Sequence, residues 1–138
     1  MMLDVVGESI AAHSRNFAGV RHDLVTHLRS VARLAAGFAE SFGAREVDYY
    51  AGLFHDVGKF RDVFQEYLRR CELNPDGRTR GPDHKAAGSV LAREFLGGLL
   101  AMTIQGHHGG LQSPTQFSSW LAEREKDSDV MCSKPRIR

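Results

Sequence analysis

Apolar residues recur along most of this chain at intervals of three and four positions, the spacing of helices with one buried face. No segment alternates apolar and polar residues persuasively, so the pattern predicts no strand. We therefore expect an all-α fold, a bundle of about five to six helices. The predicted helices span residues 22–43, 46–57, 60–68, 83–96, 99–106 and 114–126. Their apolar positions include the aromatic residues Phe38, Phe42 and Phe95.

Several residues predict where these helices begin, end and lie. Asp23 is suited to cap the first helix and Gly43 to end it, because a short carboxylate accepts from first-turn N–H groups and glycine adopts left-handed backbone. The helix over 46–57 is apolar almost throughout, which predicts a central position. Residues 72–83 are rich in turn-forming residues and are expected to form an exposed loop.

The composition is that of an ordinary globular protein of 138 residues, with 42% apolar and 25% charged residues. A formal net charge of +1 gives no general attraction for nucleic acid, so binding of DNA would need a local basic patch or bound metal. We expect one domain over residues 1–126 and a polar, flexible tail over 127–138.

The chain shows no sign of export or membrane insertion. Cys71 and Cys132 form no CxxC pair, which is typical of a reducing compartment. Residues 1–9 lack the basic-then-apolar order of a signal peptide, and no apolar run approaches the roughly 20 residues that cross a bilayer. We interpret the protein as cytoplasmic, with no membrane partner.

Histidine is the unusual component, at about twice its average frequency. Most of the predicted helices carry one at or near an end, so the imidazoles can converge in a helical bundle. Asp56 follows an apolar helix, where a buried carboxylate is costly unless it is paired or bound to metal. His13 and His22 are interpreted as having no metal role. The seven histidines are His13, His22, His27, His55, His84, His107 and His108.

Five stretches in order resemble the HD phosphohydrolase superfamily. More narrowly, they resemble the HD nuclease domain of the helicase–nuclease that degrades DNA in type I CRISPR systems. HD alone is weak evidence, but HDxGK followed by a spaced DHxxAG and a later HHGG is a specific combination. The stretches are AHS at 12–14, THLRSVARLAAGFAESFG at 26–43, AGLFHDVGKF at 51–60, PDHKAAGSVLA at 82–92 and IQGHHGGL at 104–111.

This resemblance implies a helical bundle around one or two divalent transition metal ions, for which Mn, Ni, Fe, Co and Zn are the candidates. Asp56 would bridge the ions, and Lys59 would contact the substrate phosphate; these two are the expected catalytic residues. The first ion would be bound by His27 and His55. The second would be bound by His84, His107 and His108.

The resemblance also has a gap. The family pattern includes a further aspartate on a later helix, but Asp127 and Asp129 lack the apolar context that such a ligand needs. The chain therefore resembles a C-terminally truncated domain whose first metal site has lost a ligand and whose core is partly open. A basic rim near the site is one interpretation of five arginines, and a solvated face is the other: Arg61, Arg69, Arg70, Arg78 and Arg80.

Three functional interpretations follow. The first is a metal-dependent nuclease that degrades single-stranded DNA together with a helicase domain or subunit and a CRISPR surveillance complex. The second is an HD phosphohydrolase acting on nucleotides or cyclic dinucleotides, although residues 111–117 lack the GYP segment of the cyclic-dinucleotide branch. The third is a catalytically impaired metal-binding fragment.

Overall fold

A computed structural model describes residues 9–77 and 80–126 and confirms the all-α fold class. Within these residues there is no strand, and one isolated antiparallel bridge joins Ala11 to Asp23. The elements are α1 (Leu24–Ala39), η1 (Glu40–Phe42), α2 (Arg45–Phe54), η2 (Val57–Phe60), α3 (Asp62–Leu73), α4 (Lys85–Phe95), α5 (Gly98–Gly106) and α6 (Pro114–Glu125), where η marks a 3₁₀ helix.

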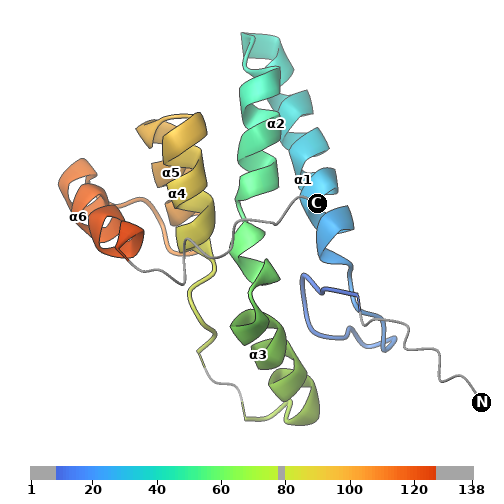
Figure 1. The fold of residues 1–138 in the computed structure, drawn as a ribbon. Helices are drawn as coiled ribbons and strands as arrows, with labels where there is room; N and C mark the ends of the chain where they lie inside the picture. The colour runs from blue at the N-terminus through green and yellow to red at the C-terminus, as the bar shows by residue number, and fades with distance from the viewer. Residues whose placement is uncertain (1–8, 78–79, 127–138) are drawn as a thin grey trace, which may run out of the picture.

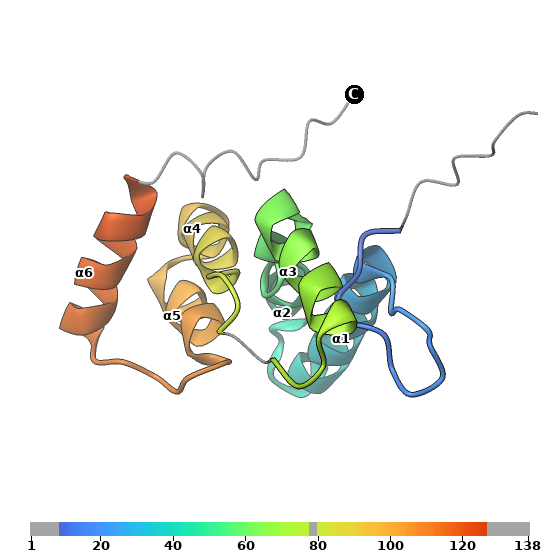
Figure 2. The same cartoon turned by 90° about the horizontal axis from the view of Figure 1, so that it is seen from below.

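The helices are arranged in pairs around α2. Helices α1 and α2 form an antiparallel hairpin, and α2 continues through η2 into α3 (Figure 1). Helices α4 and α5 pack side by side on the other face of α2, and α6 covers the outside of that pair (Figure 2). The central position predicted for α2 is therefore confirmed, although Val47 and Tyr50 in its first half are exposed.

Two glycines let the backbones of α2 and its neighbours approach closely. A Cβ atom on Gly52 would lie 2.6 Å from the Ala32 Cα atom of α1. A Cβ atom on Gly88 of α4 would lie 2.1 Å from the carbonyl oxygen of Phe54. Any larger residue at either position would push a helix away from α2, so both contacts fix the spacing of the bundle.

The main apolar core lies between α4, α5 and α6, where Ala92, Ala101 and Leu121 are fully buried. The prediction that aromatic residues on the apolar repeat would be covered is wrong for three of them. Phe38 and Phe42 are 78% and 71% exposed, and Phe95 is 65% exposed. The hairpin of α1 and α2 extends past α4 and α5, which leaves Phe38 and Phe42 uncovered near its end (Figure 1). Phe95 is the last residue of α4, and its ring centroid lies 6.4 Å from that of Phe54.

The observed helix ends agree with the sequence at some positions and differ at others. Asp23 caps α1 by accepting from the Thr26 N–H at 2.8 Å, and Gly43 ends η1 with φ of 75°. The second helix ends at Phe54 instead of residue 57, and the chain turns before η2 begins. Helix α3 continues to Leu73, so the predicted loop begins later than expected.

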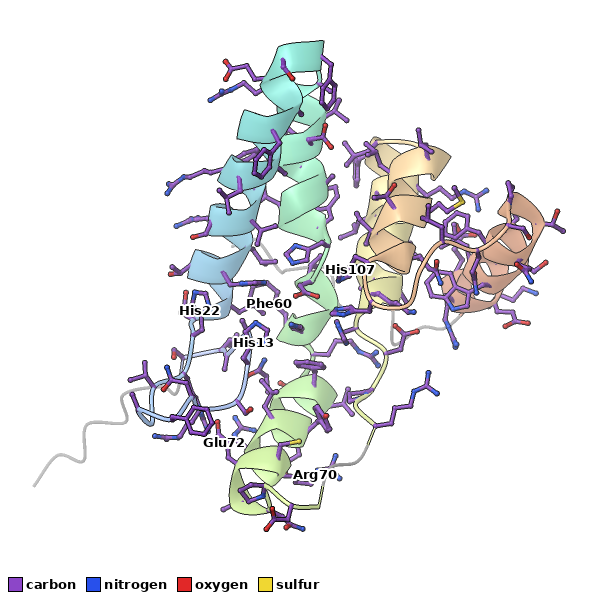
Figure 3. All side chains as sticks on the ribbon, turned by 180° about the vertical axis from the view of Figure 1, so that it is seen from behind. His13, His22, Phe60, Arg70, Glu72 and His107 are labelled. Carbon is purple, nitrogen blue, oxygen red and sulfur yellow. The ribbon has the colours of Figure 1, made fainter. Side chains whose placement is uncertain are left out.

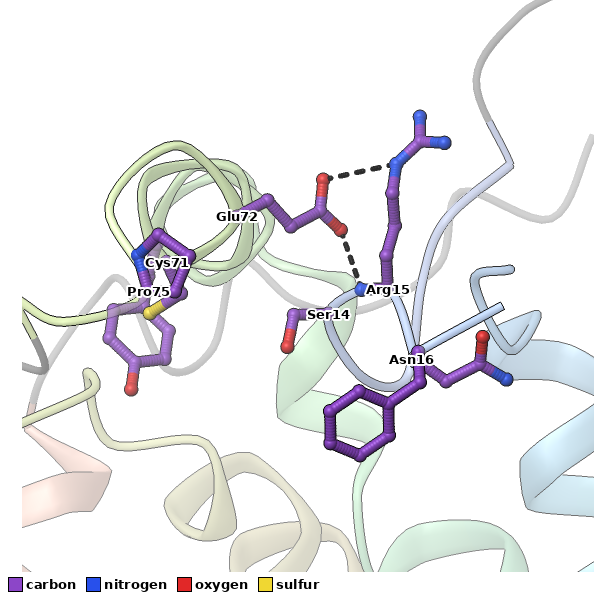
Figure 4. A pocket seen from close by; sticks show the side chains of 8 residues that line it. Ser14, Arg15, Asn16, Cys71, Glu72 and Pro75 are labelled. Atoms are coloured by element: carbon purple, nitrogen blue, oxygen red, sulfur yellow. Dashed lines mark hydrogen bonds and ion pairs between the residues drawn. The ribbon is translucent and has the colours of Figure 1, made fainter. Parts of the chain in front are cut away.

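The segment over residues 9–23 crosses the end of α3, where Glu72 anchors it (Figure 3). Arg21 donates to both carboxylate oxygens of Glu72, at 3.0 and 2.7 Å. The Arg15 N–H donates to the same carboxylate at 2.9 Å (Figure 4). Gln65 pairs with both backbone groups of Ala11 at 2.9 Å. The segment is therefore held by polar contacts to α3.

Replacing Glu72 with glutamine is expected to weaken this anchor in a pH-dependent way. The contacts with Arg21 lower the pKa of Glu72 from 4.5 to about 2. The carboxylate therefore stabilises the fold fully above pH 4.5, and its contribution disappears as the pH falls towards 2. Because the pair is partly solvated, we expect a loss of about 1 kcal/mol at pH 7. Urea unfolding of both proteins at several pH values should show the difference shrinking below pH 4.5; a constant difference would contradict it.

Two predictions remain, one about the C-terminal tail and one about membrane spans. The predicted tail, residues 127–138, lies outside the described residues. Among the described helices, none combines the length and apolar content needed to span a membrane.

Candidate metal centre

Asp56 lies at the centre of the predicted site and is only 3% exposed. Its Oδ2 atom faces Nε2 of His27 at 3.4 Å and Nε2 of His55 at 3.3 Å. The Lys59 ammonium reaches the same oxygen at 2.8 Å. One carboxylate oxygen therefore faces the two histidines that the resemblance assigns to the first ion.

The other oxygen of Asp56 faces the second predicted set. Its Oδ1 atom lies 3.6 Å from Nε2 of His84, 3.4 Å from Nε2 of His107 and 3.5 Å from Nε2 of His108. Ligands about 2.1 Å from one tetrahedral ion lie about 3.4 Å from each other, so these separations match a shared ion. All five predicted histidines thus converge on one carboxylate, divided between its oxygens.

Breaks in the helices position these side chains. Helix α2 ends at Phe54, so the turn that follows directs His55 and Asp56 into the bundle. His84 immediately precedes α4, and His107 follows the last residue of α5. Figure 3 shows His107 directed from the end of α5 towards the α2–η2 junction. Four segments distant in sequence thus contribute to one centre.

Backbone carbonyls orient three of the imidazoles. An Nδ1–H that donates to a carbonyl leaves Nε2 unprotonated and directed at the site, the usual arrangement of metal-binding histidine. Nδ1 faces the carbonyl oxygen of Gly52 at 2.6 Å in His55, of Pro82 at 3.3 Å in His84, and of Ile104 in His107.

The protonation states favour cation binding. Burial alone would raise the pKa of Asp56, but His107, His55 and Lys59 outweigh it and hold the pKa of this carboxyl well below its usual range. Burial is the main cause that lowers the pKa of three further ligands below the ordinary histidine value of 6.5, so neutral imidazoles are favoured near pH 7. These are His27, His84 and His108.

Several atoms at the centre lack the partner that a cation would supply. Nε2 of His27 and Oδ1 of Asp56 are buried and have no hydrogen-bond partner among residues 9–77 and 80–126. Nε2 of His84 lies 2.7 Å from Nε2 of His108, and the His84 nitrogen is unprotonated if its Nδ1 donates to the backbone. The donors form a set of four on Oδ1 and a set of three on Oδ2, each set within 4.8 Å. Imidazole and carboxylate donors so arranged fit divalent transition metals.

Lys59 is buried, at 3% exposure, and is not a solvated side chain. Besides Asp56 it donates to the Ala12 carbonyl oxygen at 3.1 Å, and its ammonium lies 5.6 Å from the centre of the Phe64 ring. Contact with a substrate phosphate would require the ammonium to turn away from these partners. The predicted catalytic role of Lys59 therefore stays a prediction, whereas its charge already compensates Asp56.

A cleft of about 920 Å³ opens beside the centre and is lined by Lys59, His84 and His108. Its walls also carry the basic residues Arg80, Lys85 and Arg124. Of the predicted basic rim, Arg80 lines this cleft, and Arg61 donates instead to the Asp83 carbonyl oxygen at 3.4 Å. Arg78 lies outside the described residues, and Arg69 and Arg70 do not line the described cleft.

Lys85 and Arg124 were missed by the sequence analysis. Lys85 follows a motif histidine directly, which could have identified it. Arg124 is brought in by the packing of α6, for which no local signal exists.

His13 and His22, to which the sequence analysis gave no metal role, lie beside His27. Their ring centroids are 5.4 and 5.3 Å from that of His27. Neither belongs to the two sets of clustered donors.

Comparison with known proteins identifies the family. The model of the HD domain family matches residues 24–134, which is most of the chain. No curated protein matches significantly. The matched range contains His27, His55, Asp56, His84, His107 and His108, which the structure brings together at one centre. The chain therefore belongs to the HD domain family, a family of metal-dependent phosphohydrolases.

Proposed function

We propose that this protein is a metal-dependent phosphodiesterase that degrades single-stranded DNA. The observation that carries the proposal is the arrangement around Asp56: each of its two carboxylate oxygens faces a separate set of imidazoles. A carboxylate placed between two sets of imidazoles can bind one ion through each oxygen. A neutral imidazole has only one unprotonated nitrogen and cannot bridge two ions. Two divalent ions bound there would activate water and stabilise the negative charge that develops on a phosphodiester.

The residues of the chain have distinct tasks in this proposal. Asp56 and the five histidines would bind the ions, for which Mn, Fe, Co, Ni or Zn are better suited to imidazole donors than Mg. Lys59 neutralises the buried carboxylate and keeps it oriented through the Ala12 carbonyl. The tautomers fixed by backbone carbonyls keep the Nε2 atoms directed inward.

The cleft beside the centre supports a nucleic-acid strand as substrate. Arg80, Lys85 and Arg124 can contact successive phosphates, and Tyr67 and Trp120 offer aromatic faces on which bases stack. Because the cleft of about 920 Å³ is lined from five separate segments of the chain, it has room for more than one nucleotide. We expect degradation without sequence preference, because phosphate contacts and stacking do not depend on base identity.

The proposed partners are a helicase domain or subunit and a CRISPR surveillance complex. This part of the proposal rests on the resemblance of the ordered motifs to the type I CRISPR nuclease domain. A helicase would supply single-stranded DNA, whose unpaired bases are free to stack on aromatic side chains.

The test is hydrolysis by the purified chain, with Mn, Fe, Co, Ni, Zn or Mg added in turn. The substrates are linear and circular single-stranded DNA, duplex DNA, mononucleotides and a cyclic dinucleotide. We expect transition-metal-dependent cleavage of single-stranded DNA that Asp56→Asn lacks. Lys85→Gln should raise KM for DNA several-fold with unchanged metal content, whereas Lys126→Gln, exposed and outside the cleft lining, should not. Hydrolysis of nucleotides or cyclic dinucleotides without DNA cleavage would overturn the nuclease assignment.

A further inference from the structure

We propose that His13 is a fourth protein ligand of the ion held by His27, His55 and Asp56. This inference deepens the proposed metal centre and rests on it. It assigns a metal-binding role to a residue that lies outside the family-matched range of 24–134.

The two donor sets at Asp56 are unequal. Counting Asp56 in both, the Oδ1 set has four members, whereas the Oδ2 set has three among the described residues, namely His27, His55 and Asp56. Transition metal ions with imidazole and carboxylate ligands are bound by at least four donors. The Oδ2 side therefore leaves room for one more ligand from a neighbouring segment.

The ring of His13 lies beside that of His27, at a centroid separation that two ligands of one ion can have. Its ring centroid is 5.4 Å from that of His27, and the centroids of His27 and His55 are 5.3 Å apart. Two imidazoles bound to one tetrahedral ion have centroids about 5 Å apart, so the separations of His27 from His13 and from His55 are each compatible with two ligands of one ion.

The backbone beside His13 is attached to the metal centre. The Lys59 ammonium joins Oδ2 of Asp56, at 2.8 Å, to the carbonyl oxygen of Ala12, at 3.1 Å. Gln65 holds the backbone of Ala11 and also donates to the Lys59 carbonyl oxygen at 2.7 Å. The His13 nitrogens are not within 4.8 Å of all three donors, but its side chain is exposed. A rotation about its own side-chain bonds is therefore unobstructed by a packed core.

His22 also lies beside His27, with its centroid 5.3 Å away, and serves as a matched control. Two observations favour His13 over it. His13 lines the cleft that contains Lys59, His84 and His108, whereas His22 does not. His13 also directly follows Ala12, whose carbonyl oxygen accepts from the Lys59 ammonium at 3.1 Å.

The first test measures binding of Mn and Co to the full chain by titration and by metal analysis after gel filtration. We expect two ions on the wild-type protein. His13→Ala should weaken one of them at least about tenfold. His27→Ala should weaken the same ion, and the double variant should add little, whereas His84→Ala should weaken the other. His22→Ala should bind both ions like the wild type.

Two results of this titration would overturn the proposal: unchanged binding of both ions by His13→Ala, or the loss appearing in His22→Ala instead. Two ions without DNA cleavage would leave the His13 assignment standing and overturn only the nuclease function. If no bound ion were lost in Asp56→Asn, both the His13 assignment and the nuclease function would be overturned.

A second variant guards against a purely structural effect of removing the imidazole. His13→Cys loaded with Co should show the thiolate-to-cobalt charge-transfer band in the near ultraviolet, which arises only when sulfur binds the ion directly. His22→Cys is the control and should lack the band. A spectrum of His13→Cys without it, in a protein that retains two Co ions, would overturn the assignment.

Discussion

Asp56→Asn is expected to remove both metal ions and to reduce phosphodiester hydrolysis by roughly three orders of magnitude or more. Asparagine offers one carbonyl oxygen and a donor amide, so it can no longer present an anionic oxygen to each set of histidines. Metal analysis and hydrolysis assays on the purified variant measure both effects. Retention of two ions with wild-type affinity would contradict the bridging role of this carboxylate.

The same substitution should also destabilise the protein without metal. Lys59 is buried at 3% exposure, and its ammonium would lose the carboxylate that compensates it. Leaving one partner of a buried ion pair typically costs about 3–5 kcal/mol. Adding Lys59→Met to Asp56→Asn should recover most of this loss in urea unfolding while metal binding stays absent. Failure of the double variant to recover would show that Lys59 is not the source of the instability.

Gly58→Ala is expected to disrupt the centre although Gly58 is not a ligand. A Cβ atom at this position would lie 2.0 Å from the carbonyl oxygen of His84 and 2.9 Å from its Cα atom. Backbone cannot yield as a flexible side chain does, so η2 and the start of α4 must separate. We expect a loss of about 2–3 kcal/mol in stability. The ion on the Oδ1 side of Asp56 should bind at least about tenfold more weakly, because His84 is displaced.

Gly37→Ala is the matched control for this substitution. Gly37 lies within α1, and a Cβ atom there would meet nothing within 4 Å. Alanine should stabilise the helix by about 0.5–1 kcal/mol and leave metal binding unchanged. Thermal unfolding and metal titration of both variants provide the comparison. If Gly58→Ala bound both ions like the control, the close approach of η2 to His84 would not be what positions that histidine.

The sequence predicted most of what depends on local patterns. Helix number, the cap at Asp23 and the left-handed end at Gly43 follow from apolar spacing and side-chain chemistry within a few residues. The convergence of the five motif histidines on Asp56 was anticipated through resemblance, and their division between its two oxygens matches the observed distances.

The break after α2 was not predicted, because the apolar repeat continues through Val57 and the cause is distant in sequence. Ending the helix at Phe54 lets Asp56 reach imidazoles that come from α1, α4 and α5. Local helix propensity therefore does not predict that α2 ends at Phe54.

The positions of His13, His22 and Lys59 were also beyond sequence patterns. Both histidines are brought to the centre because the segment that carries them is anchored through Arg21 to Glu72, fifty-one positions further along the chain. The resemblance predicted that Lys59 contacts the substrate, but not that the Ala12 carbonyl from this same segment gives its ammonium a buried partner. Docking of the segment over residues 9–23 onto α3 thus explains the positions of His13, His22 and Lys59.

The convergence of ligands from residues 27 to 108 has a consequence for the persistence of the protein in the cell. Bound ions would act as cross-links that close long loops between four segments, so the free energy of metal binding would add to that of folding. Without metal, the clustered donors leave a centre of unpaired polar atoms, and open forms become more populated. Cellular proteases degrade such forms, so the steady-state amount of this protein should fall when transition metals are scarce.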